Sequence, residues 1–533
     1  MSARPPSVAP QTSPLPDGSR VDPRAPGVYD APYTAPDTTP SPTHGKSPNF
    51  AARVRSALAW RYGSQVAMQL ITWSSTILVV RLLEPTDYGL FAMSQVVLTA
   101  LAFLNGQSFA TSLVQTDQVD ERRIGQIFGL LLLFNGTMGL VQFLFAPYAA
   151  AYFGEPLLID MLRVQALIFL TVPFSALPSE LLARRLEFRK QGQVTMVTAI
   201  VGAGTALVLA WLGFGVWALV YAPIAMFATR AIGLSIAARL LVKPIFNPRG
   251  AWDLVTFGGT LTICQLFWIV QSQSDIVIAG RLLPTYDLGL YSEALFLTLI
   301  ITGRFIPPIN EVALAAYSEL HREGKSLAPY FVKTARLVMS VTAPIYVGLA
   351  LTAGPAVLTL FGEKWAGLIP IVGGLALVMP ALALHLICAP VTNAMGRPRV
   401  FLFTSACGAV IMPAAFLIGI SHSGGSQDAG MGLVHAWWVA APLLCAITLT
   451  ATLPRIGVGP LELLRALAPA ALACAAMALA VLGVQRFLVI GVPALDLAWN
   501  AAIGATVYAA AFWLVWPHIV KDAWRMLRPQ TGE

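Results

Sequence analysis

Long uncharged apolar runs recur along the chain from residue 62 almost to the C-terminus. A helix needs about 20 such residues to cross the roughly 30 Å of hydrocarbon in a bilayer. The runs are continuous and lack the alternation of barrel strands, so the pattern predicts an all-α integral membrane protein with about 14 transmembrane helices. We expect these helices near residues 57–80, 88–110, 124–151, 158–182, 192–212, 216–238, 254–280, 288–310, 331–353, 367–391, 399–420, 431–451, 464–485 and 495–517.

The boundary between the predicted helices 192–212 and 216–238 rests on two glycines. Residues 191 to 229 carry no charge and are too long for one span, so we expect a break at Gly213, Phe214 and Gly215.

Charge along the chain predicts the orientation of these helices. Alternate connections hold 23 Lys and Arg residues in one set and five in the other. Because basic residues collect on the cytoplasmic side of a membrane, both termini are expected in the cytoplasm. The net charge of +8 therefore indicates membrane topology rather than nucleic-acid binding. The smaller set comprises Arg81, Arg163, Arg281, Lys364 and Arg486.

Composition agrees with a membrane protein. Hydrophobic residues make up 56% of the chain and charged residues 11%, against about 25% charged in a soluble domain. Residues 1–50 hold twelve of the 38 prolines and no apolar periodicity, which predicts a disordered tail, and there is no apolar segment typical of a cleavable signal peptide. The five cysteines fall inside predicted spans without metal-ligand spacing, so neither a disulfide nor a metal site is expected.

A repeat divides the chain. RLLEPTDYGLF begins at Arg81 and RLLPTYDLGLY begins at Arg281, an offset of 200, while Phe153-Gly154-Glu155 matches Phe361-Gly362-Glu363 at an offset of 208. An even number of helices separates the copies, which predicts two parallel six-helix lobes. The expected divisions are a tail at 1–50, an N-terminal lobe at 51–241, a C-terminal lobe at 242–455, and two added helices with the C-terminus at 456–533.

Two parallel lobes are typical of transporters that work by alternating access. The chain lacks HExxH, GxSxG and Walker A sequences, and its predicted outer connections are short, so we expect neither an enzyme nor a bound cofactor. Without a nucleotide-binding domain, the energy would come from an ion gradient, the membrane potential or the substrate gradient.

The chain resembles the bacterial polysaccharide transporter, or Wzx-type oligosaccharide flippase, family of the multidrug/oligosaccharidyl-lipid/polysaccharide exporter superfamily. The resemblance covers roughly residues 50–455, and the long proline-rich tail and the last two helices depart from it. It implies movement of an undecaprenyl-diphosphate-linked oligosaccharide across the bacterial cytoplasmic membrane for exopolysaccharide, capsule or O-antigen assembly. Polymerase and export proteins are implied partners beside the membrane lipids. The segments that carry the resemblance are RLLEPTDYGLF (81–91), LLARRLEFRKQG (181–192), SDIVIAGRLL (274–283), GLYSEA (289–294), FGEKW (361–365) and NAMGRPR (393–399).

Polar groups inside the predicted spans are the candidates for a substrate cavity. Arg230 and Arg304 lie in the half of their helices where a diphosphate would enter, and arginine binds phosphate oxygens in pairs. Snorkelling to the headgroups is the alternative for both. Arg61 is a weaker candidate because it also suits a topology charge, and the repeat-matched Gln65 and Gln265 each require a polar partner.

A second group is expected near the outer ends of the helices. Asp275, Arg281 and Glu293 are candidates for an outer gate or coupling site, with a structural ion pair as the alternative. Arg81 and Arg281, with Asp87 and Asp287, recur in the repeat and are expected to fix the two tight turns. His385 and His435 could couple protons or simply be hydrogen-bonded.

Three other functions stay open at this point. A multidrug or cation exporter of the same superfamily would change drug sensitivity and leave polymer intact. A lipid II flippase would be essential for growth, and a polytopic enzyme would turn over a soluble substrate.

Overall fold

A computed structural model describes residues 48–102, 121–185, 187–239, 242–246, 252–423, 429–488 and 490–515. The chain divides into two units, Met1–Arg53 and Val54–Glu533, and the fold reported below is that of the second. The described residues form helices and no strand. The predicted disordered tail falls almost entirely outside the described residues.

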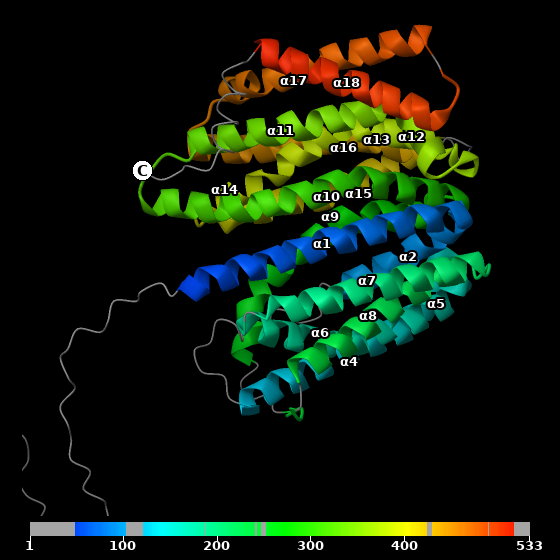
Figure 1. Ribbon diagram of the computed structural model, residues 1–533, viewed down its shortest axis with the longest axis vertical. Helices are drawn as coiled ribbons and strands as arrows, with labels where there is room; N and C mark the ends of the chain where they lie inside the picture. The colour runs from blue at the N-terminus through cyan, green and yellow to red at the C-terminus, as the bar shows by residue number, and fades with distance from the viewer. Residues whose placement is uncertain are drawn as a thin grey trace, which may run out of the picture. The chain divides into compact units, whose positions relative to one another are not determined.

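Figure 1 shows the helices, coloured from the N-terminus to the C-terminus. We refer to α1–α8 as the N-terminal half and to α9–α16 as the C-terminal half. The N-terminal half contains α1 (Pro48–Leu82), α2 (Pro85–Ala102), α4 (Glu121–Phe153), α5 (Leu157–Gln165), α6 (Leu167–Arg184), α7 (Phe188–Trp211) and α8 (Val216–Ala238). The C-terminal half contains α9 (Trp252–Leu282), α10 (Thr285–Arg322), α11 (Ala328–Leu351), α12 (Ala353–Leu360), a 3-10 turn (Glu363–Trp365), α13 (Leu368–Leu386), α14 (Cys388–Ala394), α15 (Pro398–His422) and α16 (Ala429–Ile456), and α17 (Pro460–Phe487) and α18 (Pro493–Val515) follow it.

These helices confirm the predicted class of an all-α membrane protein. Each of the fourteen predicted segments falls wholly or partly on a described helix. Eleven spans in the described part of the chain are long and apolar enough to cross a membrane, so the total of fourteen stays a prediction. Two predicted spans are each built from two helices, which join at Ala166 and at Ile387.

The predicted break between the fifth and sixth segments is confirmed. Helix α7 ends at Trp211 and α8 begins at Val216. Gly213 and Gly215 have φ values of 79° and 55°. Side chains rarely adopt this left-handed region, so glycine makes the reversal between the two helices possible.

The two halves meet where α2 packs along α10. The largest apolar core extends across this contact and includes Tyr291, Tyr346 and Trp365, none of which is measurably exposed. Beyond the halves, α17 packs on α11 and α18 packs on α17.

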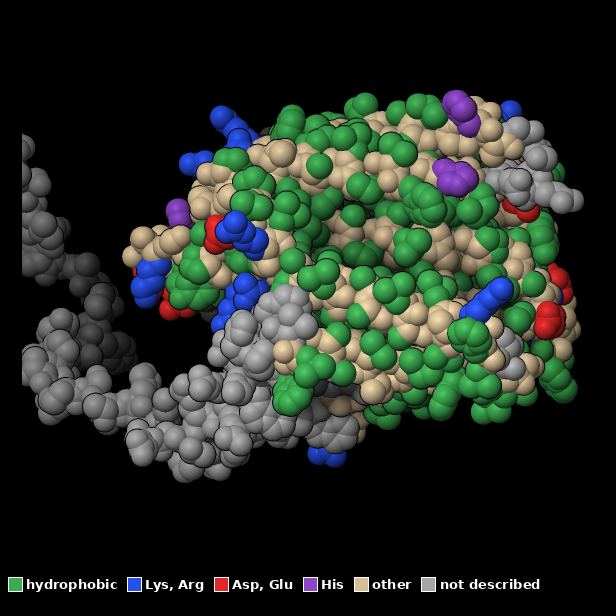
Figure 2. All heavy atoms as spheres, turned by 90° about the horizontal axis from the view of Figure 1, so that it is seen from above, with side chains coloured by type: hydrophobic (Ala, Val, Ile, Leu, Met, Phe, Trp, Pro, Cys, Tyr) green, Lys and Arg blue, Asp and Glu red, His purple; other side chains and the backbone are tan. Residues whose placement is uncertain are grey.

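The surface is that of a protein in lipid. Trp211 and Ile236 are among several large apolar side chains that are more than 70% exposed. Figure 2 shows hydrophobic side chains over most of one face, with most of the Lys and Arg side chains gathered toward one edge. This distribution suits helices that expose their sides to hydrocarbon and their ends to water.

Candidate functional site

Two glycines of the repeat lie in close backbone contact between the two halves. A Cβ on Gly89 of α2 would overlap the carbonyl oxygen of Thr285, and a Cβ on Gly289 of α10 would overlap that of Pro85. Gly89 matches Gly289 and Pro85 matches Thr285 at the offset of 200. The contact is therefore reciprocal, and glycine is required on both sides because any side chain would force the backbones apart.

Two repeat-matched arginines reach across the same junction. Arg81, at the end of α1, donates through Nε to the carbonyl oxygen of Leu360 at 2.9 Å and through Nη2 to that of Thr359. Arg281, at the end of α9, donates through Nη1 to the carbonyl oxygen of Tyr152 at 2.7 Å. Leu360 and Tyr152 immediately precede the two Phe-Gly-Glu anchors of the repeat. In both directions, the arginine at the start of one repeat copy thus binds the residues just before the Phe-Gly-Glu anchor of the other half.

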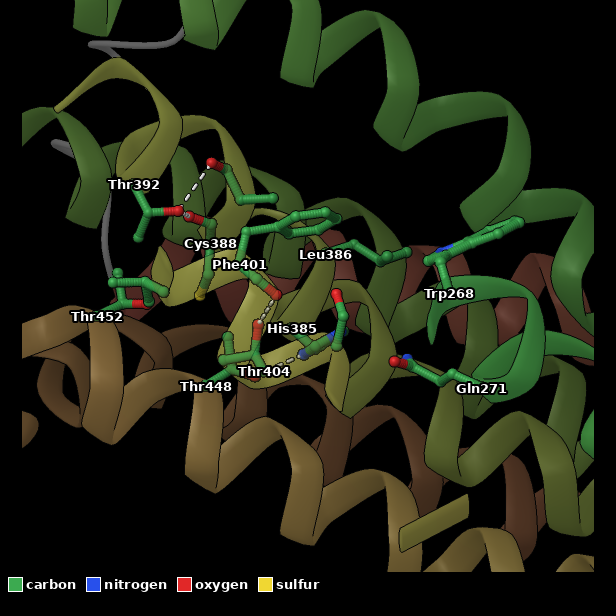
Figure 3. Close-up of a pocket in the computed structure, with 13 residues that line it drawn as sticks. Trp268, Gln271, His385, Leu386, Cys388, Thr392, Phe401, Thr404, Thr448 and Thr452 are labelled. Atoms are coloured by element: carbon green, nitrogen blue, oxygen red, sulfur yellow. Dashed lines mark hydrogen bonds between the residues drawn. The ribbon is translucent and has the colours of Figure 1, made fainter. Parts of the chain in front are cut away.

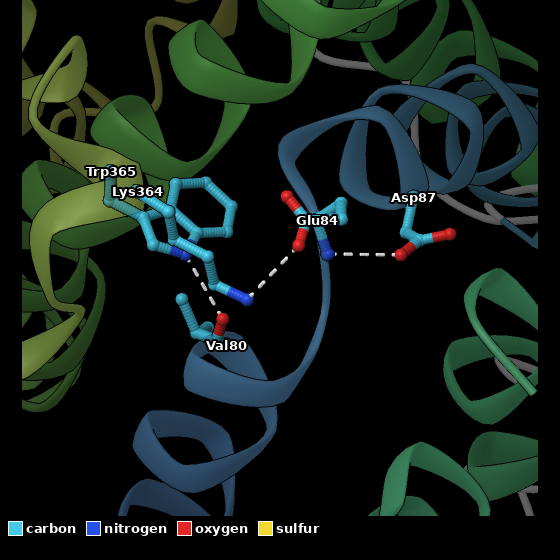
Figure 4. A network of polar contacts seen from close by, with 5 residues as sticks. All are labelled: Val80, Glu84, Asp87, Lys364 and Trp365. Carbon is cyan, nitrogen blue, oxygen red and sulfur yellow. Dashed lines mark hydrogen bonds and ion pairs between the residues drawn. The ribbon is translucent and has the colours of Figure 1, made fainter. Parts of the chain in front are cut away.

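Further contacts join the same segments, and Figure 4 shows those between the end of α1 and the segment at Lys364 and Trp365. The indole of Trp365 donates to the carbonyl oxygen of Val80 at 3.0 Å, and Lys364 lies 3.5 Å from the Glu84 carboxylate. On the matching side, the Thr285 hydroxyl donates to Glu155. We call this set the junction clamp: the Arg81 and Arg281 bonds to carbonyls, the Glu84–Lys364 and Thr285–Glu155 pairs, and the Trp365 bond.

The prediction that Arg81 and Arg281 fix the tight turns in which they lie is wrong. Each guanidinium leaves its turn and binds the opposite half instead. The turn after α1 is fixed by Asp87, whose Oδ2 accepts a hydrogen bond from the Glu84 amide at 3.0 Å. An aspartate at this position satisfies an amide that the helix leaves free, so the turn does not need the arginine.

The alternative of an ion pair among Asp275, Arg281 and Glu293 is also wrong. Asp275 is 2% exposed and its Oδ2 accepts the hydroxyl proton of Tyr291 at 2.9 Å. That hydroxyl in turn accepts from the Trp437 indole at 2.8 Å. Glu293 is 6% exposed, and its Oε2 has no hydrogen-bond partner among the described residues. Arg281 is exposed and bonds elsewhere, so neither buried carboxyl group has an ion pair with a cationic side chain among the described residues.

Beyond the junction, the face of α10 that touches α2 becomes exposed. Phe296 is seven residues after Gly289, so it lies about two turns further on the same side of the helix. Its side chain is 46% exposed, whereas the Gly289 backbone is in close contact. Arg304 is exposed. It lies about four turns along α10 from Gly289, and its position is rotated by about 60° from that of Gly289 around the helix axis. This guanidinium therefore lies on the side of α10 that faces the N-terminal half at the junction.

Of the remaining cavity candidates, Arg230 and Gln65 have described side chains. Arg230 on α8 is exposed and lies about 160° around that helix from the exposed Ile232. Gln65 is exposed on α1. The side chains of Arg61 and Gln265 lie outside the described residues. The prediction that the repeat-matched Gln65 and Gln265 each have a polar partner therefore stays a prediction.

A small polar cavity lies inside the C-terminal half (Figure 3). Its volume is about 50 Å³, which is room for water molecules. The His385 ring lies 2.9 Å from the Thr448 hydroxyl through Nδ1, as expected for a hydrogen-bonded histidine, while His435 is exposed on α16. Sequence reasoning missed the hydroxyls here, although several recur at helical spacing. The polar lining includes Gln271, His385, Thr392, Thr404, Ser405, Thr448 and Thr452.

Sequence reasoning also missed the role of Trp365. Its ring is fully buried between the halves and lies edge-on to Tyr88 at 5.5 Å. The signal was present, because Trp365 closes the FGEKW segment, whose first three residues belong to the repeat. No cluster of metal-binding side chains occurs among the described residues.

Comparison with known families identifies the chain. Residues 78–370 match the family described as polysaccharide biosynthesis protein, and the chain belongs to this family. The matched segment begins just before Arg81 and ends just after Trp365. It therefore contains every residue of the junction clamp.

Individual relatives agree with the family. The chain is 26% identical over 335 residues to the succinoglycan biosynthesis transport protein ExoT of Rhizobium meliloti (strain 1021), covering 61% of this chain and 66% of the relative. It is 21% identical to the teichuronic acid biosynthesis protein TuaB of Bacillus subtilis (strain 168), covering 62% and 69%. It is 22% identical to the lipopolysaccharide biosynthesis protein WzxC of Escherichia coli (strain K12), covering 56% and 61%. The chain thus spans about two thirds of the length of these relatives.

Solved structures share the fold. The lipid II flippase MurJ in an inward closed conformation superposes with a TM-score of 0.66 at 12% identity, covering 86% of this chain and 98% of that one. An inward-facing multidrug resistance transporter of the MATE family superposes with a TM-score of 0.58 at 15% identity, covering 73% and 94%. These likenesses show that the chain shares the fold of these two membrane transporters.

Proposed function

We propose that the protein is a flippase that moves an undecaprenyl-diphosphate-linked oligosaccharide repeat unit across the bacterial cytoplasmic membrane. The observation that carries this proposal is the family match, which covers both copies of the repeat and the whole junction clamp. Relatives named for succinoglycan, teichuronic acid and lipopolysaccharide biosynthesis support a polysaccharide intermediate as the cargo. The repeat unit would serve exopolysaccharide, capsule or O-antigen assembly, with polymerase and export proteins as later partners.

The physical chemistry of such a cargo requires a polar route. Burial of an unpaired hydroxyl costs about 1–3 kcal/mol, so a sugar chain with a dozen hydroxyls meets a barrier of roughly tens of kcal/mol in bare lipid. A route between the two halves removes this barrier. We assign Arg304, with Arg230, to the diphosphate on this route because both guanidiniums are exposed and have no ion pair among the described residues.

The junction clamp closes one end of that route. On the orientation predicted from Lys and Arg, this end faces away from the cytoplasm and both termini lie in the cytoplasm. Export then requires the clamp to open and re-form in each cycle. The bonds suit such a cycle, because guanidinium-to-carbonyl bonds are each worth about 1.5–3 kcal/mol and water can replace them.

Asp275 and Glu293 are proposed as the coupling site. A carboxylate buried among helices without a cation is costly, so each group is expected to hold a proton or a metal cation in this closed state. Glu293 lies one turn beyond Gly289 on α10, beside the junction. Opening of the clamp would expose it to the other side of the membrane.

Deletion of the gene in the native host tests the function. We expect loss of the surface polysaccharide and accumulation of its undecaprenyl-linked intermediate, both restored by the full chain. Normal polymer with altered drug sensitivity would instead support a multidrug exporter, and arrested peptidoglycan synthesis would support a lipid II flippase. Turnover of a soluble substrate by the purified protein would support an enzyme.

A further inference from the structure

A second hollow lies between α11 and α17, at the end of the helices opposite the junction clamp. It has a volume of about 320 Å³. Arg336 enters it from the third turn of α11, and Arg465 enters it from the second turn of α17. Helix α17 lies outside the repeat, so this hollow belongs to neither copy of the junction. Its lining residues are Val332, Arg336, Leu461, Glu462, Arg465 and Ala466.

The lining of the hollow has an excess of positive charge among the described residues. It contains two guanidiniums and one carboxylate, and no ion pair within 4.0 Å joins Glu462 to either arginine. The Nε of Arg336 is buried and has no hydrogen-bond acceptor among the described residues. Leaving such a donor unpaired costs about 1–3 kcal/mol, so the site favours an added acceptor.

The backbone of α17 adds donors at the same place. The helix begins with Gly459 as its N-cap and Pro460 in its first turn, and no side chain caps it. The free amides and the helix dipole at this end favour an anion. The two guanidiniums supply the planar pairs of N–H groups that match phosphate oxygens.

Apolar residues line the part of the hollow that faces the interior of the membrane. Val332 and Ala466 are buried in one apolar cluster that joins α11 to α17, and Leu461 is 57% exposed beside them. A ligand with a phosphate next to hydrocarbon would satisfy both the cationic and the apolar lining. A free phosphate would satisfy only the first.

We propose that this hollow binds the headgroup phosphate of an anionic glycerophospholipid, which holds the added helix α17 against α11. The predicted orientation places the hollow at the cytoplasmic leaflet, where basic pockets between helices bind anionic lipids. The lipid would therefore be part of the attachment of α17 and α18 to the transporter. This site is separate from the route assigned to Arg230 and Arg304.

Native mass spectrometry of the full chain in detergent tests the site. Wild-type protein is mixed with phosphatidylglycerol or with phosphatidylcholine, and bound lipid is counted on the intact protein. The test variant is Arg336→Gln/Arg465→Gln. The matched control is Arg322→Gln/Lys333→Gln, which removes two exposed cations at the same end of the helices without touching the hollow.

We expect phosphatidylglycerol affinity to fall at least about 10-fold in the test variant and to be unchanged in the control, which corresponds to about 1.4 kcal/mol. Equal binding of the two lipids to wild type, or equal loss in both variants, would overturn the proposal. If inorganic phosphate displaces the lipid at comparable concentration, the site is a free-phosphate site and the lipid assignment is wrong. If undecaprenyl diphosphate binds and phosphatidylglycerol does not, the hollow belongs to the substrate.

Should the double glutamine variant fail to fold, Arg336→Lys/Arg465→Lys replaces it. Lysine keeps the charge but loses the planar fork. A smaller loss of phosphatidylglycerol affinity than in a single Arg465→Gln variant is then expected. Affinity equal to wild type in both variants would contradict the proposal.

Discussion

The backbone of Gly289 lies against the carbonyl oxygen of Pro85 so closely that a Cβ on the glycine would overlap that oxygen. The equivalent pair, Gly89 and Thr285, makes the same contact in the opposite direction. An internal repeat thus creates an interface in which each half presents the same segments to the other. Arg81 and Arg281 extend this reciprocity to hydrogen bonds.

A common reporter serves the predictions about this junction. It carries Glu84→Cys and Lys364→Cys in a chain whose five native cysteines are replaced by alanine. The original side chains lie 3.5 Å apart, so a short bifunctional thiol reagent should join the two introduced thiols when the junction is closed. Glu84 is exposed and Lys364 is partly exposed, so removal of this pair should cost no more than about 1 kcal/mol.

Gly289→Ala should open the junction. The added methyl group meets backbone, which cannot yield as a side chain can, and the expected cost to the closed state is about 1–3 kcal/mol. We expect slower cross-linking of the reporter and reduced polymer export. Gly303→Ala on the same helix is the matched control, because its Cβ would meet open space. Equal cross-linking in the two variants would contradict the close contact.

Arg81→Lys should impair closure more than Arg281→Lys. Arg81 uses two nitrogens to bind two carbonyl oxygens, whereas Arg281 donates to one. A lysine can replace a single donor but not the fork. The expected difference between the variants is about one hydrogen bond to a charged group, roughly 1.5–3 kcal/mol, measured as the rate of reporter cross-linking. The reverse order of the two variants would be inconsistent with this geometry.

Glu293→Gln should abolish coupling without unfolding the protein. A neutral amide of the same shape removes the cost of a buried carboxyl group that has no cationic partner. We expect a thermal midpoint at or above that of wild type, together with transport that no longer responds to an imposed proton or sodium gradient. Glu311→Gln, at an exposed position of the same helix, should keep the response. A normal gradient response in the Glu293 variant would remove this residue from the coupling site.

Charge reversal tests the proposed phosphate ligands. Arg304→Glu and Arg230→Glu should each repel the diphosphate and reduce polymer export at least about 10-fold, as expected when a contact worth about 1.4 kcal/mol is lost. Arg322→Glu, at the end of α10, is the control and should retain export. Full export with glutamate at both proposed positions would exclude them as ligands.

The sequence allowed much of this architecture to be predicted. Apolar length alone located the helices, since a span in lipid has little freedom in length or composition. The repeat predicted two related halves, and the structure brings its matched segments together, with Arg81 and Arg281 each bound next to a Phe-Gly-Glu anchor of the other half. Gly213 and Gly215 likewise predicted the break between α7 and α8 from the backbone freedom of glycine alone.

The partners of these residues could not be predicted. An arginine in a tight turn can bind its own turn or a carbonyl in another helix, and only the packing of α2 on α10 decides between them. The partner of Asp275 could not be predicted either. It is Tyr291 on the next helix, and the distance of Asp275 from Arg281 depends on the directions of the two side chains. The cavity near His385 is built from hydroxyls on α14, α15 and α16, which no short motif records.

Flipping by the purified reporter protein in liposomes tests the central claim most directly. An undecaprenyl-diphosphate-linked oligosaccharide is placed in one leaflet, and its appearance in the other is followed with a sugar-specific enzyme. We expect flipping to proceed in the reduced protein, to stop when a cleavable reagent bridges the two introduced thiols of the reporter, and to resume when the bridge is cleaved. Flipping that continues at the same rate across the bridged junction, or that is absent before bridging, would contradict it.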